Sequence, residues 1–329
     1  MKAQDIKSRR SALGAMGVAA LALTAGIAAP AMAQAKTTRL VVAFPPGGPV
    51  DFVARTISEQ LGKELGSQVV VENRDGANGS IAAQYVSKTA PAGTLWLTSV
   101  GAVAINPVLY DKLPYNPAKD LAPVSLVVNN VEVMVVNANN PASTGAGFIS
   151  NAKLNKDGAT MASSGTGSVP HLAMELLASA TGAPLLHIPY KGAAPAINAV
   201  LAGQVDAFFG DIPGLIGFIK SGRIKPVGLA ARKRHPLLPD VRTFQEMGIS
   251  GVDSDNWYAI FTSKSTPAAE IDRLNKAIRA TLANEAVRAK LSTSGAEPSS
   301  STPAELATLM KNDTAKWSKV IRDKKIRPE

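Results

Sequence analysis

One local pattern occurs twice in this sequence, and it directs the chain toward an α/β fold. In each copy an apolar strand runs into a short loop of Gly, Pro, Ser or Thr, and the loop opens directly into an amphipathic helix. The copies predict strands at Leu40–Phe44 and Ala159–Ala162, with helices starting near Val50 and Val169. The start of a helix presents unpaired N–H groups at the positive end of its dipole, so each loop is a candidate anion-binding site.

The alternation of strand and helix continues through both halves, which favours α/β with mainly parallel sheets flanked by helices. In the first helix Val53, Ile57, Leu61 and Leu65 recur every fourth residue and give one apolar stripe. Further strands are expected at Val69–Glu72, Leu95–Ser99, Val124–Val128, Val131–Val136, Leu185–Pro189, Val205–Phe209, Lys225–Ala230 and Trp257–Thr262. Further helices are expected at Ser80–Thr89, Ala194–Leu201, Pro213–Ser221, Pro267–Ala286, Glu285–Leu291 and Pro303–Ile321.

The order of these elements predicts two lobes joined by two passages. The long β-branched runs at Val124–Val128 and Val131–Val136 indicate the first passage, and Trp257–Thr262 indicates the return. Residues 34–135 together with 252–329 are therefore expected to form lobe 1, and residues 136–251 lobe 2. The C-terminal helices are expected to pack on lobe 1.

The first 33 residues read as an export signal. Lys7, Arg9 and Arg10 precede an apolar Ala/Leu/Gly run, and Ala31-Met32-Ala33 forms a small-x-small cleavage site. We therefore predict a signal peptide that is cleaved near Ala33 and an exported, periplasmic protein. The arginine pair leaves both ordinary and twin-arginine export open. No later stretch is long and apolar enough to cross a bilayer, so the mature chain is expected to be soluble.

Composition excludes several classes of function. The chain has no cysteine, so disulfides, thiolate catalysis and Cys-ligated metals do not arise. The formal net charge is +10, yet the basic residues are scattered and aromatic residues make up only 5%. This pattern argues against nucleic-acid binding and favours attraction of anionic solutes.

Catalytic and metal patterns are weak. A secreted hydrolase could use Ser164 or Ser168 with His171, but no Gly-x-Ser-x-Gly pentapeptide is present, and local helix capping is favoured. His171, His187 and His235 have no second ligand at metal-binding spacing. We predict no catalytic residue, no metal and no cofactor.

The second loop suits recognition of a small anion by backbone and hydroxyl groups. Ser163, Ser164, Thr166 and Ser168 supply neutral donors beside free N–H groups. The alternative is that Ser168 caps its helix and the glycines only permit the turn. For two acidic residues as well, the sequence leaves open a structural role and a ligand-binding role. Asp51 and Asp211 either cap helices or hold an ammonium group of a ligand.

At these loops the sequence resembles the periplasmic solute receptors of tripartite tricarboxylate transporters, the Bug receptors. The resemblance runs through the whole predicted mature chain. Its motifs are Phe44-Pro45-Pro46-Gly47-Gly48-Pro49, Val71-Glu72-Asn73-Arg74, Ile105-Asn106-Pro107, Ser163-Ser164-Gly165-Thr166-Gly167-Ser168, His187-Ile188-Pro189-Tyr190-Lys191-Gly192, Gly203-Gln204-Val205-Asp206 and Leu238-Pro239-Asp240-Val241-Arg242-Thr243.

The resemblance implies a two-lobed, flytrap-like periplasmic-binding-protein fold that holds a carboxylated solute between its lobes. It implies integral membrane permease subunits as partners, and we expect a monomer without enzymatic activity. The candidate ligand contacts that it implies, with Asp211 added, are Gly47, Gly48, Asp51, Asn73, Asn106, Ser163, Ser164, Gly165, Thr166, Gly167, Ser168, His171, Tyr190 and Asp211. Gly48 is expected where the backbone approaches the ligand with a positive φ angle.

The sequence departs from the family pattern at a few positions. Asp75 and Asn78 stand where the family usually has Pro and Gly, and Gly210-Asp211 stands where many members carry Asp-Asn. The role of Asp211 therefore stays open, and so does the identity of the carboxylate. The alternatives to a transport receptor are a Ser/His hydrolase and a ligand-sensing partner of a signalling protein.

Overall fold

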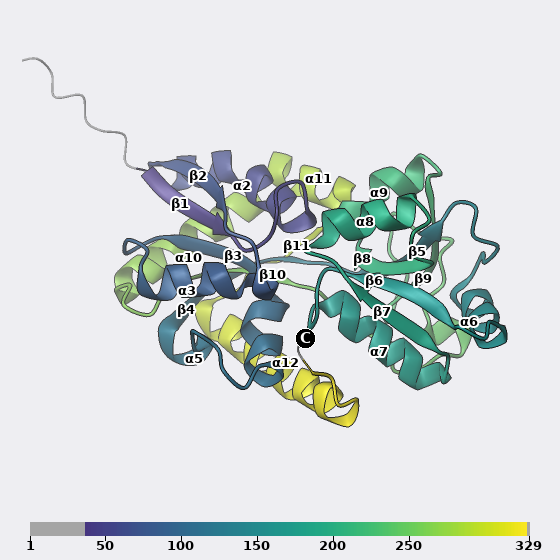
Figure 1. Ribbon diagram of the computed structural model, residues 1–329. Helices are drawn as coiled ribbons and strands as arrows, with labels where there is room; N and C mark the ends of the chain where they lie inside the picture. Colours follow the sequence, from purple (N-terminus) through teal and green to yellow (C-terminus); the bar gives the residue numbers. More distant parts are fainter. Residues whose placement is uncertain (1–36, 328–329) are drawn as a thin grey trace, which may run out of the picture. The chain divides into compact units, whose positions relative to one another are not determined.

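Two β-sheets, each covered by helices on both faces, organise residues 37–327, the part of the chain described by the computed structural model (Figure 1). The predicted signal peptide, residues 1–33, lies outside the described residues. Within them, no helix has the length and apolar character needed to cross a membrane.

The first sheet has the strand order β11-β4-β10-β3-β1-β2. Its strands are β1 (Thr37–Val42), β2 (Gln68–Asn73), β3 (Leu95–Ser99), β4 (Leu121–Asn129), β10 (Tyr258–Ser263) and β11 (Glu297–Pro298). Its helices are α2 (Pro49–Leu65), α3 (Ser80–Lys88), α4 (Asn106–Leu109), α5 (Pro117–Asp120), α10 (Ala268–Ala283), α11 (Glu285–Ser294) and α12 (Pro303–Asp323), with short helical turns at Ala77–Gly79 and Gly101–Ile105. Helices α3 and α12 share one apolar core with the sheet, while α2, α10 and α11 share the other.

The second sheet has the strand order β7-β6-β8-β5-β9. Its strands are β5 (Glu132–Asn137), β6 (Ala159–Ser163), β7 (Leu185–Pro189), β8 (Ala207–Asp211) and β9 (Ile224–Leu229). Its helices are α6 (Gly145–Leu154), α7 (Val169–Thr181), α8 (Ala193–Leu201) and α9 (Ile212–Lys220), with a short helical turn at Gln245–Met247. Helices α6 and α7 pack on one face, and α8 and α9 on the other.

Helix α2 forms where the spacing of apolar residues predicted it. Val53, Ile57, Leu61 and Leu65 are all buried, and they pack against the first sheet. Pro49 lies in the first turn, where its missing N–H removes no helical hydrogen bond. Gly66 ends the helix with φ 59°, a left-handed conformation that glycine adopts without strain.

The expectation of mainly parallel sheets needs a correction, because each sheet is mixed. Strand β1 pairs in parallel with β2 and β3, and β6 pairs in parallel with β7 and β8. Strands β5 and β10, however, pair antiparallel with both of their neighbours. Each of these two strands follows a strand of the other sheet along the chain, β5 after β4 and β10 after β9. Neither strand is therefore reached by the helical crossover within one sheet that usually joins parallel neighbours.

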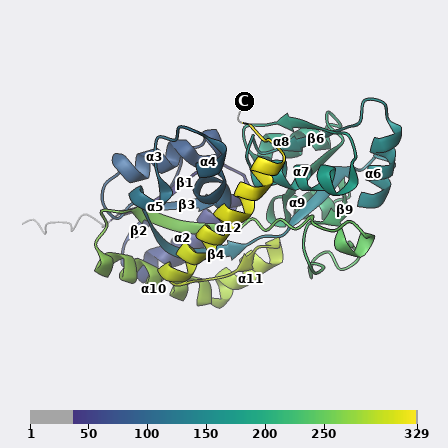
Figure 2. The same ribbon diagram turned by 90° about the horizontal axis from the view of Figure 1, so that it is seen from below.

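Two passages join the sheets, from β4 to β5 and from β9 to β10. Strand β5 pairs wholly inside the second sheet, so the expected end of lobe 1 at residue 135 falls within a strand of the second sheet. Helix α12 packs on β4 and also reaches α7 (Figure 2). Just past the end of α12, the side chain of Lys324 contacts that of Ser179 on α7.

Candidate functional site

The N-terminal ends of α2, α7, α8 and α9 all border one cavity between the two sheets. The cavity has about 450 Å³ of space between atoms, including space open to solvent. Its walls are Phe44, Pro45, Gly48, Pro49, Val50, Asn78, Ser99, Ser164, Ser168, Val169, Pro170, Ala193, Ala194, Asp211, Asn256 and Tyr258. Because helix starts present free N–H groups and positive partial charge, this arrangement favours an anion.

Buried polar atoms without a partner border the same cavity. Ser168 Oγ, Asp211 Oδ1 and Asn256 Oδ1 have no hydrogen-bond partner within the described residues. The three residues are 3%, 8% and 6% exposed. An unpaired buried polar atom costs about 1–3 kcal/mol, so three around one cavity point to a bound group that completes them.

The structure corrects the capping interpretation of Ser168 and Asp211. Both stand at the N-cap position, of α7 and α9 respectively, but neither side chain accepts a capping hydrogen bond from its helix. The backbone therefore begins each helix without using these side chains. Their polar atoms stay available to the cavity.

Asp51 lies behind the first loop and supports it. Its Oδ2 accepts hydrogen bonds from Gly47 N at 3.0 Å and Arg55 Nε at 2.9 Å, and its Oδ1 accepts from Asn73 Nδ2 at 2.9 Å. Burial opposes ionisation of Asp51, but the bonds from Arg55, Gly47 and Asn73 outweigh it and lower its pKa. Asn73 also donates to Phe44 O at 3.0 Å. The predicted site residues Gly47, Asp51 and Asn73 thus fix the loop and do not border the cavity.

Gly48 borders the cavity, as expected, but its conformation differs from the prediction. Its φ is −81°, which every residue adopts, while the positive φ of 79° belongs to Gly47. A Cβ at Gly48 would lie 3.5 Å from Pro45 O, an ordinary contact. The positive-φ position that favours glycine therefore falls one residue earlier than predicted.

Ser163 and His171 support the second loop from beneath. Ser163 Oγ lies 2.6 Å from His187 Nε2 and accepts from Gly165 N at 3.1 Å. His171 Nδ1 accepts from Gly167 N at 3.1 Å, and its ring stacks on His187 with centroids 3.8 Å apart. Burial and the neighbouring His171 lower the pKa of His187 to about 4. The pairing of Ser164 or Ser168 with His171 that the hydrolase alternative requires is not formed among the described residues, since His171 Nδ1 accepts from Gly167 N.

Asn106 and Gly167 lie where the two sheets approach each other. Buried Asn106 accepts from Asn78 Nδ2 at 2.9 Å, and the same amide donates to Gly167 O at 3.2 Å. A Cβ on Gly167 would fall 2.1 Å from Leu109 Cδ2, and Gly167 has φ 77°. Only glycine fits this closely approaching loop.

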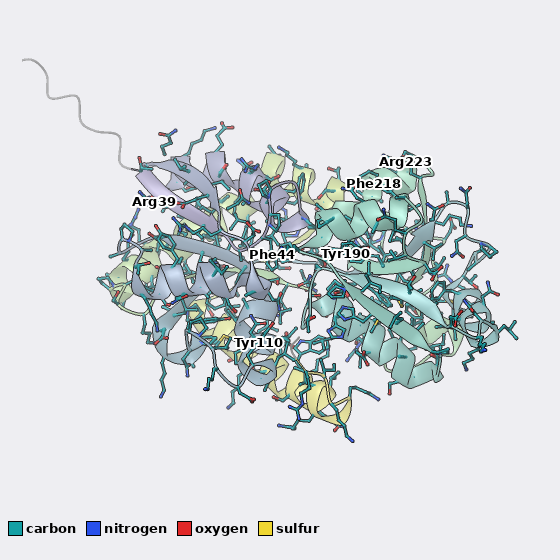
Figure 3. The ribbon with its side chains drawn as sticks, viewed as in Figure 1. Arg39, Phe44, Tyr110, Tyr190, Phe218 and Arg223 are labelled. Atoms are coloured by element: carbon teal, nitrogen blue, oxygen red, sulfur yellow. The ribbon has the colours of Figure 1, made fainter. Side chains whose placement is uncertain are left out.

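Gly165, Thr166 and Tyr190 line a second, neighbouring cavity with Ser164. It has about 900 Å³ of space, including open solvent, and shares Phe44 and Asn78 with the first cavity. In Figure 3 the labelled Phe44 and Tyr190 lie in the middle of the view, where elements of the two sheets meet, with Tyr110 below them. The aromatic walls leave room for a ligand longer than the first cavity alone would hold.

Asp211 lines the first cavity, and a second carboxyl group, Glu132, lies beside Asp211 in the sheet. They are directly opposed in the β5–β8 ladder, and Glu132 is fully buried. Asp211 Oδ2 accepts from Asn256 Nδ2 at 3.0 Å and from the Tyr258 hydroxyl. Burial raises the pKa of Asp211 to about 7, and burial together with Asp211 raises the pKa of Glu132 well above its usual range.

Sequence reasoning missed Asn78, Ser99, Asn256 and Tyr258 as cavity-lining residues. Asn256 precedes β10, the returning strand, and no motif marks it. Tyr258 begins β10 and belongs to Trp257-Tyr258, a further motif that resembles the receptor family, but that motif did not indicate a place in the cavity. Asn78 did carry a signal, because it replaces a glycine that the resembling family usually has. Within the described residues, no group of three or more His, Asp or Glu side chains is placed to hold a metal ion.

Comparisons with known proteins agree with the two-sheet α/β fold. A family described as "Tripartite tricarboxylate transporter family receptor" matches residues 53–326. The structure of the periplasmic binding protein BugD is 31% identical, with TM-score 0.85 over 89% of this chain and 99% of BugD. MatC (Rpa3494) from Rhodopseudomonas palustris with bound malate is 31% identical, with TM-score 0.81 over 87% and 99%. R. palustris Rpa4515 with adipate is 30% identical, with TM-score 0.86 over 89% and 99%. The expected fold class is confirmed.

Proposed function

Because this chain belongs to the tripartite tricarboxylate transporter receptors of the Bug family, we propose that it captures one small carboxylate between its two sheets and delivers it to the transporter's membrane subunits. The observation that carries the proposal is the cavity bordered by the starts of α2, α7, α8 and α9, together with its unpartnered polar atoms. The malate and adipate found in two similar structures support a carboxylate as the ligand class.

In this proposal the carboxylate is held by backbone N–H groups and neutral side chains. No Lys, Arg or His is among the described residues that line the first cavity. Gly48, Ser164 and Ser168 face the ligand directly, and Asp211 completes the cavity. Gly165, Thr166 and Tyr190 bound the rest of the ligand. The other predicted site residues hold the two loops in place. Neutral donors bind an anion without burying a fixed cation, which suits a receptor that must release its ligand.

Capture works by closure of two lobes. We place their boundary at the β4–β5 and β9–β10 connections, which shifts the first boundary from residue 135 to about residue 130. Contacts from both lobes meet at Asn78 and Gly167 and at Pro45 and Gly192. A ligand that touches both lobes only when they are closed shifts the equilibrium toward that state.

The family places such receptors in the periplasm, which agrees with the predicted export signal. The proposal also includes cleavage of the signal peptide near Ala33, a monomeric receptor, and the permease subunits as its partners. The family to which the chain belongs is a family of solute-binding receptors. The hydrolase alternative has no supporting Ser/His geometry in the cavity, and no structural observation favours the sensing alternative.

The test is calorimetry on protein freed of ligand by unfolding and refolding. Malate and adipate serve as probes, with their dimethyl esters as matched uncharged controls. The proposal expects one free acid to bind with one site per chain, in the presence of a chelator, and the esters not to bind. Equal binding of acid and ester would overturn it. Mass spectrometry of the same samples detects ester cleavage, which would favour a hydrolase.

A further inference from the structure

Two buried carboxyl groups meet where the chain first enters the second sheet. Glu132 on β5 and Asp211 on β8 are partners in the antiparallel ladder, so their side chains leave the same face of the sheet. Both residues are buried, and Asp211 borders the first cavity. Two carboxylates so close in a dry environment cannot both ionise easily, because neither finds water or a counter-charge.

The groups that face this pair supply no positive charge. Asp211 faces Tyr258 on β10 and Asn256 just before that strand, and Glu132 faces Ser254 and Asp255 of the same segment. Helices α2, α7 and α8 contribute no charged side chain to the walls of the cavity. The hydrogen bonds from Tyr258 and Asn256, and the N-terminal dipole of α9, which begins next to Asp211, favour an ionised carboxylate there, but burial outweighs the hydrogen bonds and raises the pKa.

The hydrogen bonds indicate where a proton would sit. Asp211 Oδ2 accepts from the Tyr258 hydroxyl and from Asn256 Nδ2, so that oxygen is already occupied as an acceptor. Asp211 Oδ1 has no partner within the described residues. A proton on Oδ1 gives the cavity a second hydroxyl donor, in addition to the unpaired hydroxyl of Ser168.

We propose that Asp211 recognises the bound carboxylate as a neutral carboxylic acid, with Oδ1–H donating a hydrogen bond to a ligand oxygen. This inference rests on the proposed function. When Asp211 is ionised before capture, binding takes up one proton from solvent onto Oδ1. The ligand itself drives that step, since its negative charge repels an ionised carboxylate and attracts a protonated one. If Asp211 instead held an ammonium group as an ionised carboxylate, affinity would rise with pH as Asp211 loses its proton.

The pKa of Asp211, raised to about 7 by burial, sets where this dependence falls. Below that pH the carboxyl is already protonated and affinity is constant. Above it, each unit of pH lowers the population of the binding form, so affinity falls by about tenfold per unit. Malate and adipate do not titrate in this range, because their carboxyl groups lose their protons near pH 4–5.

The first experiment measures proton uptake by the wild-type protein. Calorimetry with malate and adipate is repeated from pH 6 to 9 in buffers of different ionisation enthalpy. The proposal expects uptake approaching one proton per bound ligand at the alkaline end, together with the fall in affinity. Binding without proton uptake overturns the role of Asp211 and leaves the receptor function intact. Failure of both acids to bind at any pH overturns the proposed function and this inference with it.

The second experiment compares three variants. In Asp211→Asn an amide donor replaces the acid, so binding should persist within about threefold of the wild-type value at low pH and lose its dependence on pH. Glu132→Gln should keep both the proton uptake and the pH profile, because the neutral amide resembles the protonated Glu132. Asp240→Asn, at an exposed carboxyl far from the ladder in sequence, controls for net charge and should match wild type.

Loss of binding by Asp211→Asn at every pH, with an unchanged melting temperature, overturns the proposal. So does proton uptake that vanishes in Glu132→Gln and persists in Asp211→Asn.

Discussion

At the scale of single residues, the cavity is lined by side chains that occupy helix N-cap positions but make no capping hydrogen bond. Ser168 has the backbone conformation of an N-cap, yet its hydroxyl leaves the helix uncapped. Thr144, by contrast, caps α6 in the usual way by accepting from Gly147 N at 3.1 Å. A free hydroxyl at a buried helix start is a cost to the empty protein, and it is recovered when a ligand accepts its hydrogen bond.

Ser168→Ala should therefore weaken binding without lowering the stability of the empty protein. A lost hydrogen bond to a charged group corresponds to about 1.5–3 kcal/mol, or a rise in Kd of roughly 10- to 150-fold. Thr144→Ala is the matched control. It should lower the free energy of unfolding by about 1 kcal/mol and leave Kd unchanged. Calorimetry and urea unfolding measure the two quantities. A destabilised Ser168→Ala with normal affinity would restore the capping interpretation.

At the scale of elements, a hydrogen bond joins a loop of the first sheet to a loop of the second sheet beside the cavity. The turn before α3 carries Asn78, whose amide donates both to Asn106 within its own lobe and to Gly167 O on the loop before α7. Asn78 has φ 47°, a conformation that glycine adopts with less strain. The side chain therefore occupies a strained backbone position and gains a hydrogen bond between lobes.

Asn78→Gly should loosen closure while relieving the backbone. Loss of the bond to Gly167 corresponds to about 1 kcal/mol, so Kd should rise several-fold, mainly through faster dissociation. Ala77→Gly is the matched control, since Ala77 also has φ 47° but supplies no side-chain hydrogen bond. Stopped-flow measurement of ligand release compares the two. Identical release rates would mean that the amide does not hold the lobes together.

At the scale of the whole described unit, the proposed closure depends on how closely the lobes can approach. Gly167 combines a positive φ with a Cβ position only 2.1 Å from Leu109 Cδ2. Leu109 ends the short helix α4 of the first lobe, so a methyl group on Gly167 would separate the lobes as they close.

Gly167→Ala should fold and yet fail to close. Gly182→Ala is its control at the other end of α7, because Gly182 has φ 64° with no atom within 4 Å of an added Cβ. Both variants carry a similar backbone strain of about 1 kcal/mol, but only Gly167→Ala should lose affinity. Small-angle scattering should show wild type and Gly182→Ala becoming more compact with ligand. Normal compaction of Gly167→Ala would contradict closure through this loop.

The sequence alone determined the local elements and the loops that matter. Apolar spacing located α2, strand β3 matches its predicted range, and the two loop-to-helix motifs both border the cavity because helix starts follow from local chemistry. The resemblance supplied the receptor family.

The sequence could not distinguish Ser168, which lines the cavity, from Ser163, which is hydrogen-bonded to His187 beneath the loop. Nor could it foresee that β10 brings Asn256 and Tyr258 against Asp211, or that β5 sets Glu132 opposite it. Those pairings join residues at least 45 positions apart, and at the crossing Asn130 donates to the carbonyl of Asn256, 126 positions away. Hydrophobic periodicity specifies which face of an element is buried, whereas the packing of both sheets decides which polar atoms lose their partners and what charge they carry.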